Sequence, residues 1–144
     1  MGFSTGPFLK AALFCQDAIE GKDNVFTLVR IVDVITHTAQ GPAVPDEMPP
    51  IQHGLKMVIM IAPGMARGRH SLKIEAENPM GLRATDRVFI VTIHFEEGRT
   101  ANLIIDSVFT FELEGTYLFH VSLDDDHLTT MPLTIRYNRV MTGN

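Results

Sequence analysis

The chain of 144 residues has no tryptophan and only one cysteine, Cys15. A single cysteine excludes an intrachain disulfide and any metal site built from paired cysteines, and it fits a reducing compartment. No apolar run approaches the roughly 18 residues that a membrane-spanning helix needs, and residues 1–10 lack the basic and apolar regions of a signal peptide. We therefore expect a cytoplasmic protein without a membrane partner.

Basic residues are also in the minority, with 12 Lys and Arg against 17 Asp and Glu, for a formal net charge of −5. The excess lies in residues 73–144, because residues 1–72 hold equal numbers of both signs. Nucleic acids and anionic membranes carry dense negative charge, so an acidic surface disfavours both as partners. We predict no nucleic-acid partner.

A sustained helical period is missing as well, and the pattern that is present is typical of strands. Short β-branched and aromatic runs alternate with clusters of Gly, Pro, Asn and Asp. The runs cover residues 8–15, 24–36, 54–62, 70–77, 87–95, 101–112, 115–123 and 128–137. The length suits one domain, residues 1–144. We predict an all-β fold, an antiparallel two-sheet β-sandwich of about eight strands with Greek-key, immunoglobulin-like or jelly-roll-like connections.

Alternation within the strands predicts which faces are buried. The odd-numbered residues Phe89–Phe95 and Tyr117–Leu123 form apolar faces, whereas strand 54–62 is mostly apolar on both faces. The second face needs a cover. Either the Pro-rich segment 37–53, which we expect to cross between the sheets as an extended loop, packs over it, or the face mediates self-association.

Two stretches carry a resemblance to a known family. The first is Ala11-Ala12-Leu13-Phe14-Cys15-Gln16-Asp17 with Gly21-Lys22 and Phe26–Val29 after it; the second is Glu114–Leu123 followed by Met131–Ile135. Together they resemble an uncharacterised family of short bacterial proteins with an Ala-rich first strand ending in Cys-x-Asp, a Gly-Lys turn and a Gly-x-Tyr strand. The resemblance implies a β-sandwich and transfers no catalytic residue. Separately, Gly115-x-Tyr117 is similar to the tyrosine corner of immunoglobulin-like sandwiches.

Several residues are candidates for metal binding. His94 and His120, with Asp106 or Glu112, would form a surface site if neighbouring strands brought them together; solvent-facing histidines are the alternative. Asp124, Asp125 and Asp126 lie on a predicted loop that suits calcium or, alternatively, a solvated turn.

The remaining candidates have equally plain alternatives. Arg67, Arg69 and His70 on the Gly-rich segment 63–69 would bind a phosphate or carboxylate, or form a solvated loop. Glu75 and Glu77 share a strand face, a spacing that suits glycoside chemistry and also ordinary solvent-facing residues. Cys15 lies in an apolar context that favours a structural role over a nucleophilic one.

These observations favour a non-catalytic module that binds another protein, with loops 37–53 and 63–69 as contact regions and a homo-oligomer as an option. The alternative is a small-ligand or carbohydrate-binding sandwich, with or without calcium. An enzyme is the third hypothesis, for which no catalytic motif is found, and no cofactor is expected.

Overall fold

The computed structural model describes residues 5–143, apart from the side chains of residues 84–87. Its strands and one short 3-10 helix are β1 (Phe8–Glu20), η1 (Lys22–Asn24), β2 (Phe26–Val32), β3 (Val34–Gly41), β4 (Ile51–Ala62), β5 (Gly68–Glu77), β6 (Arg83–Phe95), β7 (Ala101–Phe111), β8 (Gly115–Leu123) and β9 (Asp126–Met141). No helix within this part of the chain is long and apolar enough to cross a bilayer. The all-β prediction is confirmed.

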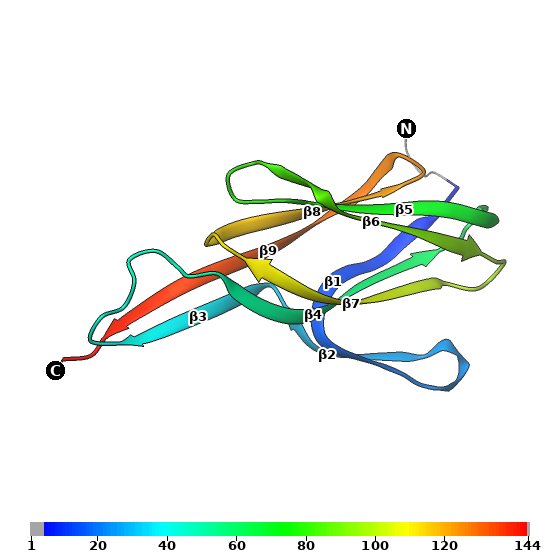
Figure 1. Ribbon diagram of the computed structural model, residues 1–144. Helices are drawn as coiled ribbons and strands as arrows, with labels where there is room; N and C mark the ends of the chain where they lie inside the picture. The colour runs from blue at the N-terminus through cyan, green and yellow to red at the C-terminus, as the bar shows by residue number, and fades with distance from the viewer. Residues whose placement is uncertain (1–4, 144) are drawn as a thin grey trace.

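The strands form two layers (Figure 1), a four-stranded sheet of order β2-β1-β4-β7 and a five-stranded sheet of order β3-β9-β8-β5-β6. The sandwich prediction is therefore confirmed. All neighbouring pairs are antiparallel except β3 and β9, which run parallel along Val34–Gly41 and Thr134–Met141. The prediction that every strand pair is antiparallel is therefore wrong for this one pair.

The run 24–36, predicted as one strand, is two strands in different sheets. β2 pairs with β1, and after Asp33 the chain enters the five-stranded sheet as β3. The carbonyl of Asp33 accepts a hydrogen bond from the backbone N–H of Thr134 at 3.0 Å. Since β-branched residues continue on both sides of Asp33, the sequence pattern gives no sign of the change of sheet.

Part of the strand order resembles that of immunoglobulin-like sandwiches, and β2 and β3 are additional edge strands. β1, β4 and β7 take the places of strands A, B and E, while β5, β8 and β9 take those of C, F and G, with β6 added beside C. In constant-type immunoglobulin domains a strand D lies beside strand E. In the described part of this chain that place is empty, and β7 is the edge of its sheet.

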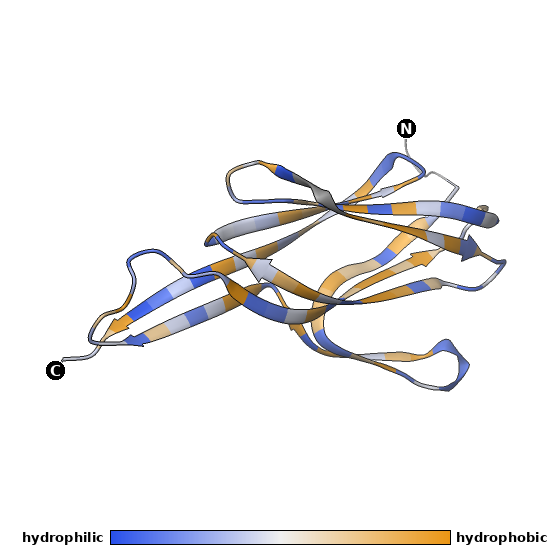
Figure 2. Cartoon of the chain, in the orientation of Figure 1, coloured by the Kyte–Doolittle hydropathy of each residue, from blue (hydrophilic) through white to orange (hydrophobic). Residues whose placement is uncertain are grey.

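The core lies between the two layers and follows the predicted alternation. Tyr117–Leu123 bury their odd-numbered side chains, and Ile93 and Phe95 are buried on β6. Phe89, predicted on the same inward face of β6, is instead 37% exposed, because β6 is the edge strand of its sheet. The apolar stretches of β1 and β4 stand out in Figure 2. Phe14 joins the layers, with its ring centroid 4.9 Å from that of Phe119 on the opposite sheet.

The outer face of β4 is covered by the curl of its own sheet. Val58 and Cys15 alternate with core residues on their strands, so both point away from the sandwich interior, yet both are fully buried. Asn102 on β7 donates a hydrogen bond to Asn24 in the β1–β2 turn at 3.1 Å, although β2 and β7 are opposite edges of the sheet. Cys15 is therefore buried, as its apolar sequence context predicted, and burial raises the pKa of its thiol.

The predicted loop 37–53 is shorter than expected and does not cover that face. β3 extends to Gly41, so residues 42–50 make the crossing between the sheets. They pack on β9 instead: the Tyr137 hydroxyl donates to the Pro45 carbonyl at 2.8 Å, and Arg139 pairs with Asp46 at 2.9 Å. Here β3 and the end of β9 form an extension beyond β8 (Figure 1), which we call the β3–β9 arm.

Candidate functional site

The basic residues predicted on loop 63–69 do not form a free cluster. The Arg67 guanidinium donates hydrogen bonds to the carbonyls of Gly64 and Ala66, both at 2.7 Å, and lies 3.9 Å from the Glu97 carboxylate. Arg69 is exposed, and its side chain forms no hydrogen bond or ion pair with the described residues. Arg67 thus fixes the loop, which leaves Arg69 as the available cation of the predicted anion site.

His70 contacts Asp124, the first of the three consecutive aspartates. One carboxylate oxygen of Asp124 contacts Nδ1 of His70, and the other accepts the Ser71 N–H at 2.9 Å. The hydrogen bond to Asp124 raises the pKa of His70. Partial burial disfavours the Asp124 carboxylate, but the hydrogen bonds from Ser71 and His70 prevail and lower its pKa.

Asp124 and Asp125 form the two-residue turn between β8 and β9, with φ of 50° and 69°. Positive φ at both central residues defines a type I′ turn. Asp125 and Asp126 are exposed, while the Asp124 carboxylate contacts β5. Among the residues whose side chains are described, no group of three or more His, Cys, Asp or Glu is placed to hold a metal ion.

The structure does not bring His94 and His120 together. His94 pairs with Arg69 and His120 with Glu75 along β5, which separates them by about 20 Å at roughly 3.3 Å per residue. Asp106, one of their proposed fellow ligands, is on the other sheet and pairs with Lys56. The predicted histidine site is not assembled.

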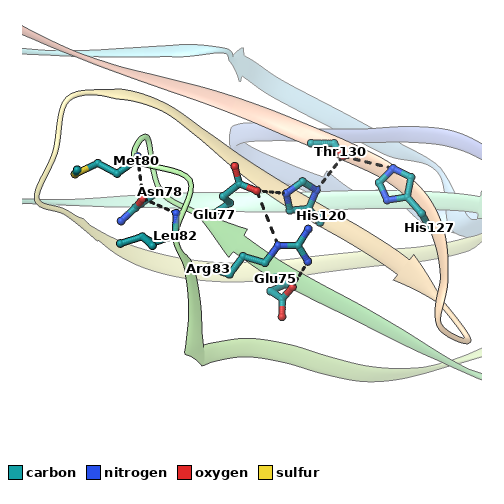
Figure 3. A network of polar contacts seen from close by, with 9 residues as sticks. All are labelled: Glu75, Glu77, Asn78, Met80, Leu82, Arg83, His120, His127 and Thr130. Atoms are coloured by element: carbon teal, nitrogen blue, oxygen red, sulfur yellow. Dashed lines mark hydrogen bonds and ion pairs between the residues drawn. The ribbon is translucent and has the colours of Figure 1, made fainter.

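His120 instead belongs to a polar network on the outer face of the five-stranded sheet (Figure 3). Its Nε2 lies 3.0 Å from Glu77 and its Nδ1 3.2 Å from the Thr130 hydroxyl. Arg83 joins this group through contacts of 3.9 Å to Glu77 and 2.5 Å to Glu75. The same-face carboxylates singled out in the sequence are thus bound to one guanidinium.

Glu77, His120 and Thr130 follow the order of an acid, a base and a hydroxyl nucleophile. A catalytic site of this type also needs a concave surface for substrate and donors for an oxyanion. Neither hollow described below includes His120 or Thr130. The direct cross-strand pairing of Glu75, His120 and Thr130 on β5, β8 and β9 accounts for the network as sheet stabilisation.

A groove of about 620 Å³ opens between β6 and β7. These strands are the edges of the two sheets, and residues 96–100 join them at one end only. The groove is lined by Ala76, Asn78, Leu82, Arg83, Val88, Phe89, Val108, Phe109, Thr110, Phe111, Glu112, Leu113, Tyr117 and Phe119. It therefore lies beside the empty place of strand D, and we call it the β6–β7 groove.

Aromatic side chains of the core reach the β6–β7 groove. Phe109 lies between Phe111 and Phe119, at ring-centroid distances of 5.7 and 5.4 Å, and Phe111 contacts Tyr117 edge-on at 5.0 Å. Phe109 and Phe119 come from opposite sheets, so the gap between the two edges gives access to the centre of the sandwich.

A tyrosine corner shapes one end of the groove, as Gly115-x-Tyr117 predicted. The Tyr117 hydroxyl donates to the Leu113 carbonyl at 2.8 Å and accepts from the Leu113 N–H at 3.1 Å. Burial raises the pKa of Tyr117. Gly115 has φ of 124°, and a Cβ there would lie 2.7 Å from Pro79 in the β5–β6 turn, so this corner and that turn are closely packed.

The rim of the β6–β7 groove is unusually apolar for exposed surface. Val108 is 74% exposed, Leu82 63% and Phe89 37%. Met80, beside Leu82 in the same turn, is 73% exposed. Contiguous exposed apolar side chains around a concavity are typical of binding surfaces.

A second, more open hollow of about 460 Å³ separates the β1–β2 turn from the β6–β7 connection. Glu20, Asn24 and Phe26 line one side, and His94, Glu96 and Arg99 the other. His94, predicted as a ligand, thus lies in a polar hollow with Glu96 as its nearest described carboxylate, at 4.0 Å.

Sequence reasoning missed the β6–β7 groove because strand order creates it. One signal was available: Met80 and Leu82 are large apolar residues in a turn, where polar residues are usual. No family model, curated protein or solved structure significantly matches this chain.

Proposed function

We propose that this protein is a non-catalytic binding module that recognises another protein through the β6–β7 groove. The observation that carries the proposal is the gap between two sheet edges, where core aromatics meet an exposed apolar rim. The groove replaces loops 37–53 and 63–69 as the expected contact region. Residues 42–50 pack on β9, and Arg67 is held within its own loop, so both loops are partly engaged within the protein.

Further support comes from the charged residues outside the groove, because several of them are already used in contacts within the protein. Several of the charged candidates from the sequence are engaged in local contacts, as His70 is with Asp124 and Glu77 with His120. The resemblance to an uncharacterised bacterial family implies only a β-sandwich fold and adds no activity. A second copy of this chain is one protein that would fit the proposal.

The test is selection of random peptides displayed on phage against the immobilised wild-type protein. Val108→Lys places a charge on the groove rim, and the exposed side chain makes this change compatible with folding. We expect the enriched peptides to bind this variant at least about fivefold more weakly, since anchor contacts in interfaces contribute more than about 1 kcal/mol.

Val25→Lys is the matched control, because Val25 is also exposed (61%) but lies beside the β1–β2 turn, outside the groove lining. This variant should bind the enriched peptides as the wild type does. Failure to enrich any peptide, or binding that Val108→Lys leaves unchanged, would refute the proposal.

A small apolar ligand is the second candidate, because the groove volume lies within the range of roughly 300–1,000 Å³ found for ligand sites. A carbohydrate fits less well, since Tyr117 uses its hydroxyl within the corner and the chain has no tryptophan. A thermal-shift screen separates these candidates: a hydrophobic compound that raises the wild-type midpoint but not that of Val108→Lys would favour the small-ligand function.

A further inference from the structure

We infer that the partner binds as an extended strand along the free edge of β7, antiparallel to it, and that it carries basic residues at its amino-terminal end. This inference rests on the proposed binding function and specifies the partner. The occupant would take the empty place of strand D and extend the four-stranded sheet by one strand.

The lining of the groove shows that β7 faces it with its backbone edge. Six consecutive residues, Val108–Leu113, line the groove, and the first four belong to β7. Successive side chains of a strand point to opposite faces, so a groove lined by both Val108 and Phe109 must lie beside the strand rather than over one face. The described residues of β6 in the lining are Arg83, Val88 and Phe89.

The edge of β7 also lacks the features that usually protect an edge strand. Lysines, prolines and bulges prevent pairing with other chains, and Val108-Phe109-Thr110-Phe111 contains none of them. By contrast, the edge strand β2 carries the charged Arg30 at φ 54°. β7 pairs with β4 without a register shift from Ile51–Phe111 to Ile61–Ala101, so its edge is regular along the groove.

Charge at one end of the groove specifies the end of the partner strand. The charged residues among the described lining are Arg83 and Glu112, and the Arg83 guanidinium is already paired with Glu75 and Glu77 on the outer face of the five-stranded sheet. Glu112 is exposed and forms no ion pair with the described residues. An antiparallel strand places its amino end beside the carboxyl end of β7, so Lys or Arg at that end would meet Glu112.

The probe is a synthetic peptide with two lysines at its amino end followed by alternating valine and threonine. Two derivatives are methylated on the backbone nitrogen at every second residue, one on each alternate set. Only one set of N–H groups faces a given neighbour in a sheet. We expect one derivative to lose at least about tenfold in affinity and the other to bind as the parent does, while β7 amides gain protection from hydrogen exchange.

Charge is tested with a second probe that carries the lysines at its carboxyl end. The wild type should prefer the first probe by about two- to fivefold, the size expected for one exposed ion pair, and Glu112→Lys should reverse the preference. If groove-dependent phage peptides exist but both methylated derivatives bind equally, or β7 gains no protection, strand addition is refuted and the binding function stands. If no groove-dependent peptide exists, both proposals fail.

Discussion

At the scale of single residues, the contact between His70 and Asp124 couples stability to pH. The raised pKa of His70 stabilises the fold fully below its ordinary value of 6.5, and this stabilisation is lost as pH rises through the folded-state pKa. The lowered pKa of Asp124 acts in the other direction: its stabilisation is present above 3.8 and lost as pH falls through the folded-state pKa. The pair therefore stabilises most between these limits.

We predict that His70→Gln reduces the free energy of unfolding most between pH 3.8 and 6.5, and less on either side. The pH-dependent part should be at most about 1 kcal/mol, because partly exposed ion pairs are screened by solvent. Urea unfolding across this pH range measures it. Asp125→Asn, at the neighbouring turn residue without a described side-chain contact, is the control and should follow the wild type; a difference between His70→Gln and wild type that is constant with pH contradicts the prediction.

At the scale of elements, the two residues of the β8–β9 turn allow backbone strain and side-chain contacts to be measured separately, because both have positive φ but only Asp124 makes side-chain contacts with described residues. Asp124 and Asp125 both have positive φ, which costs less for Asp than for most residues but least for glycine. We predict that Asp125→Gly stabilises the protein by about 0.5–1 kcal/mol, since Asp-Gly is a preferred pair in type I′ turns.

Asp124→Gly has the same backbone benefit but removes the carboxylate that contacts His70 and Ser71. It should therefore be less stable than Asp125→Gly, and the two variants form a matched pair. Urea or thermal unfolding gives the comparison, and equal stabilities would show that the Asp124 carboxylate contributes nothing measurable.

Strand positions were predictable because alternation and turn residues are local. Each predicted run overlaps a strand, and the inward face of β8 and that of β6 at Ile93 and Phe95, though not at Phe89, follow from the order of residues alone. The change of sheet at Asp33 was not predictable, because the pairing of β3 with β9 depends on residues about a hundred positions away. The Asp124 turn was recognised, with calcium binding and a solvated turn as the alternatives for its carboxylates, but the contact of Asp124 with His70 was not foreseen because His70 lies on a distant strand.

In the candidate site, too, local features were predictable from the sequence and features that depend on strand order were not. Gly115-x-Tyr117 predicted the corner at one end of the β6–β7 groove, and the hydrogen bonds of Tyr117 bear that out. The groove itself depends on β6 and β7 being edges of different sheets, which follows from the strand order and not from any motif. His94 and His120 were chosen because they share a type of strand face, but the strand order puts them on β6 and β8, opposite different ends of β5.

At the scale of the whole molecule, two long strands connect regions that would otherwise be separate. β1 pairs with β4 through Phe8–Cys15 and with β2 through Phe14–Glu20. β9 pairs with β8 through Asp126–Ile135 and continues into the β3–β9 arm. Met48, from the loop that packs on this arm, is also part of the main core. Unfolding the arm would therefore disturb the sandwich.

We predict a single cooperative unfolding transition, and the two tyrosines of this tryptophan-free chain allow a direct measurement. Tyr117 reports on the sandwich and Tyr137 on the arm. In Tyr137→Phe and in Tyr117→Phe, tyrosine fluorescence and far-ultraviolet circular dichroism should give the same urea midpoint within each variant. Comparing two probes in one variant removes the effect of the substitution on stability. An earlier midpoint for Tyr137 than for the circular dichroism of the same variant would mean that the arm unfolds independently, and the chain would then be two cooperative units.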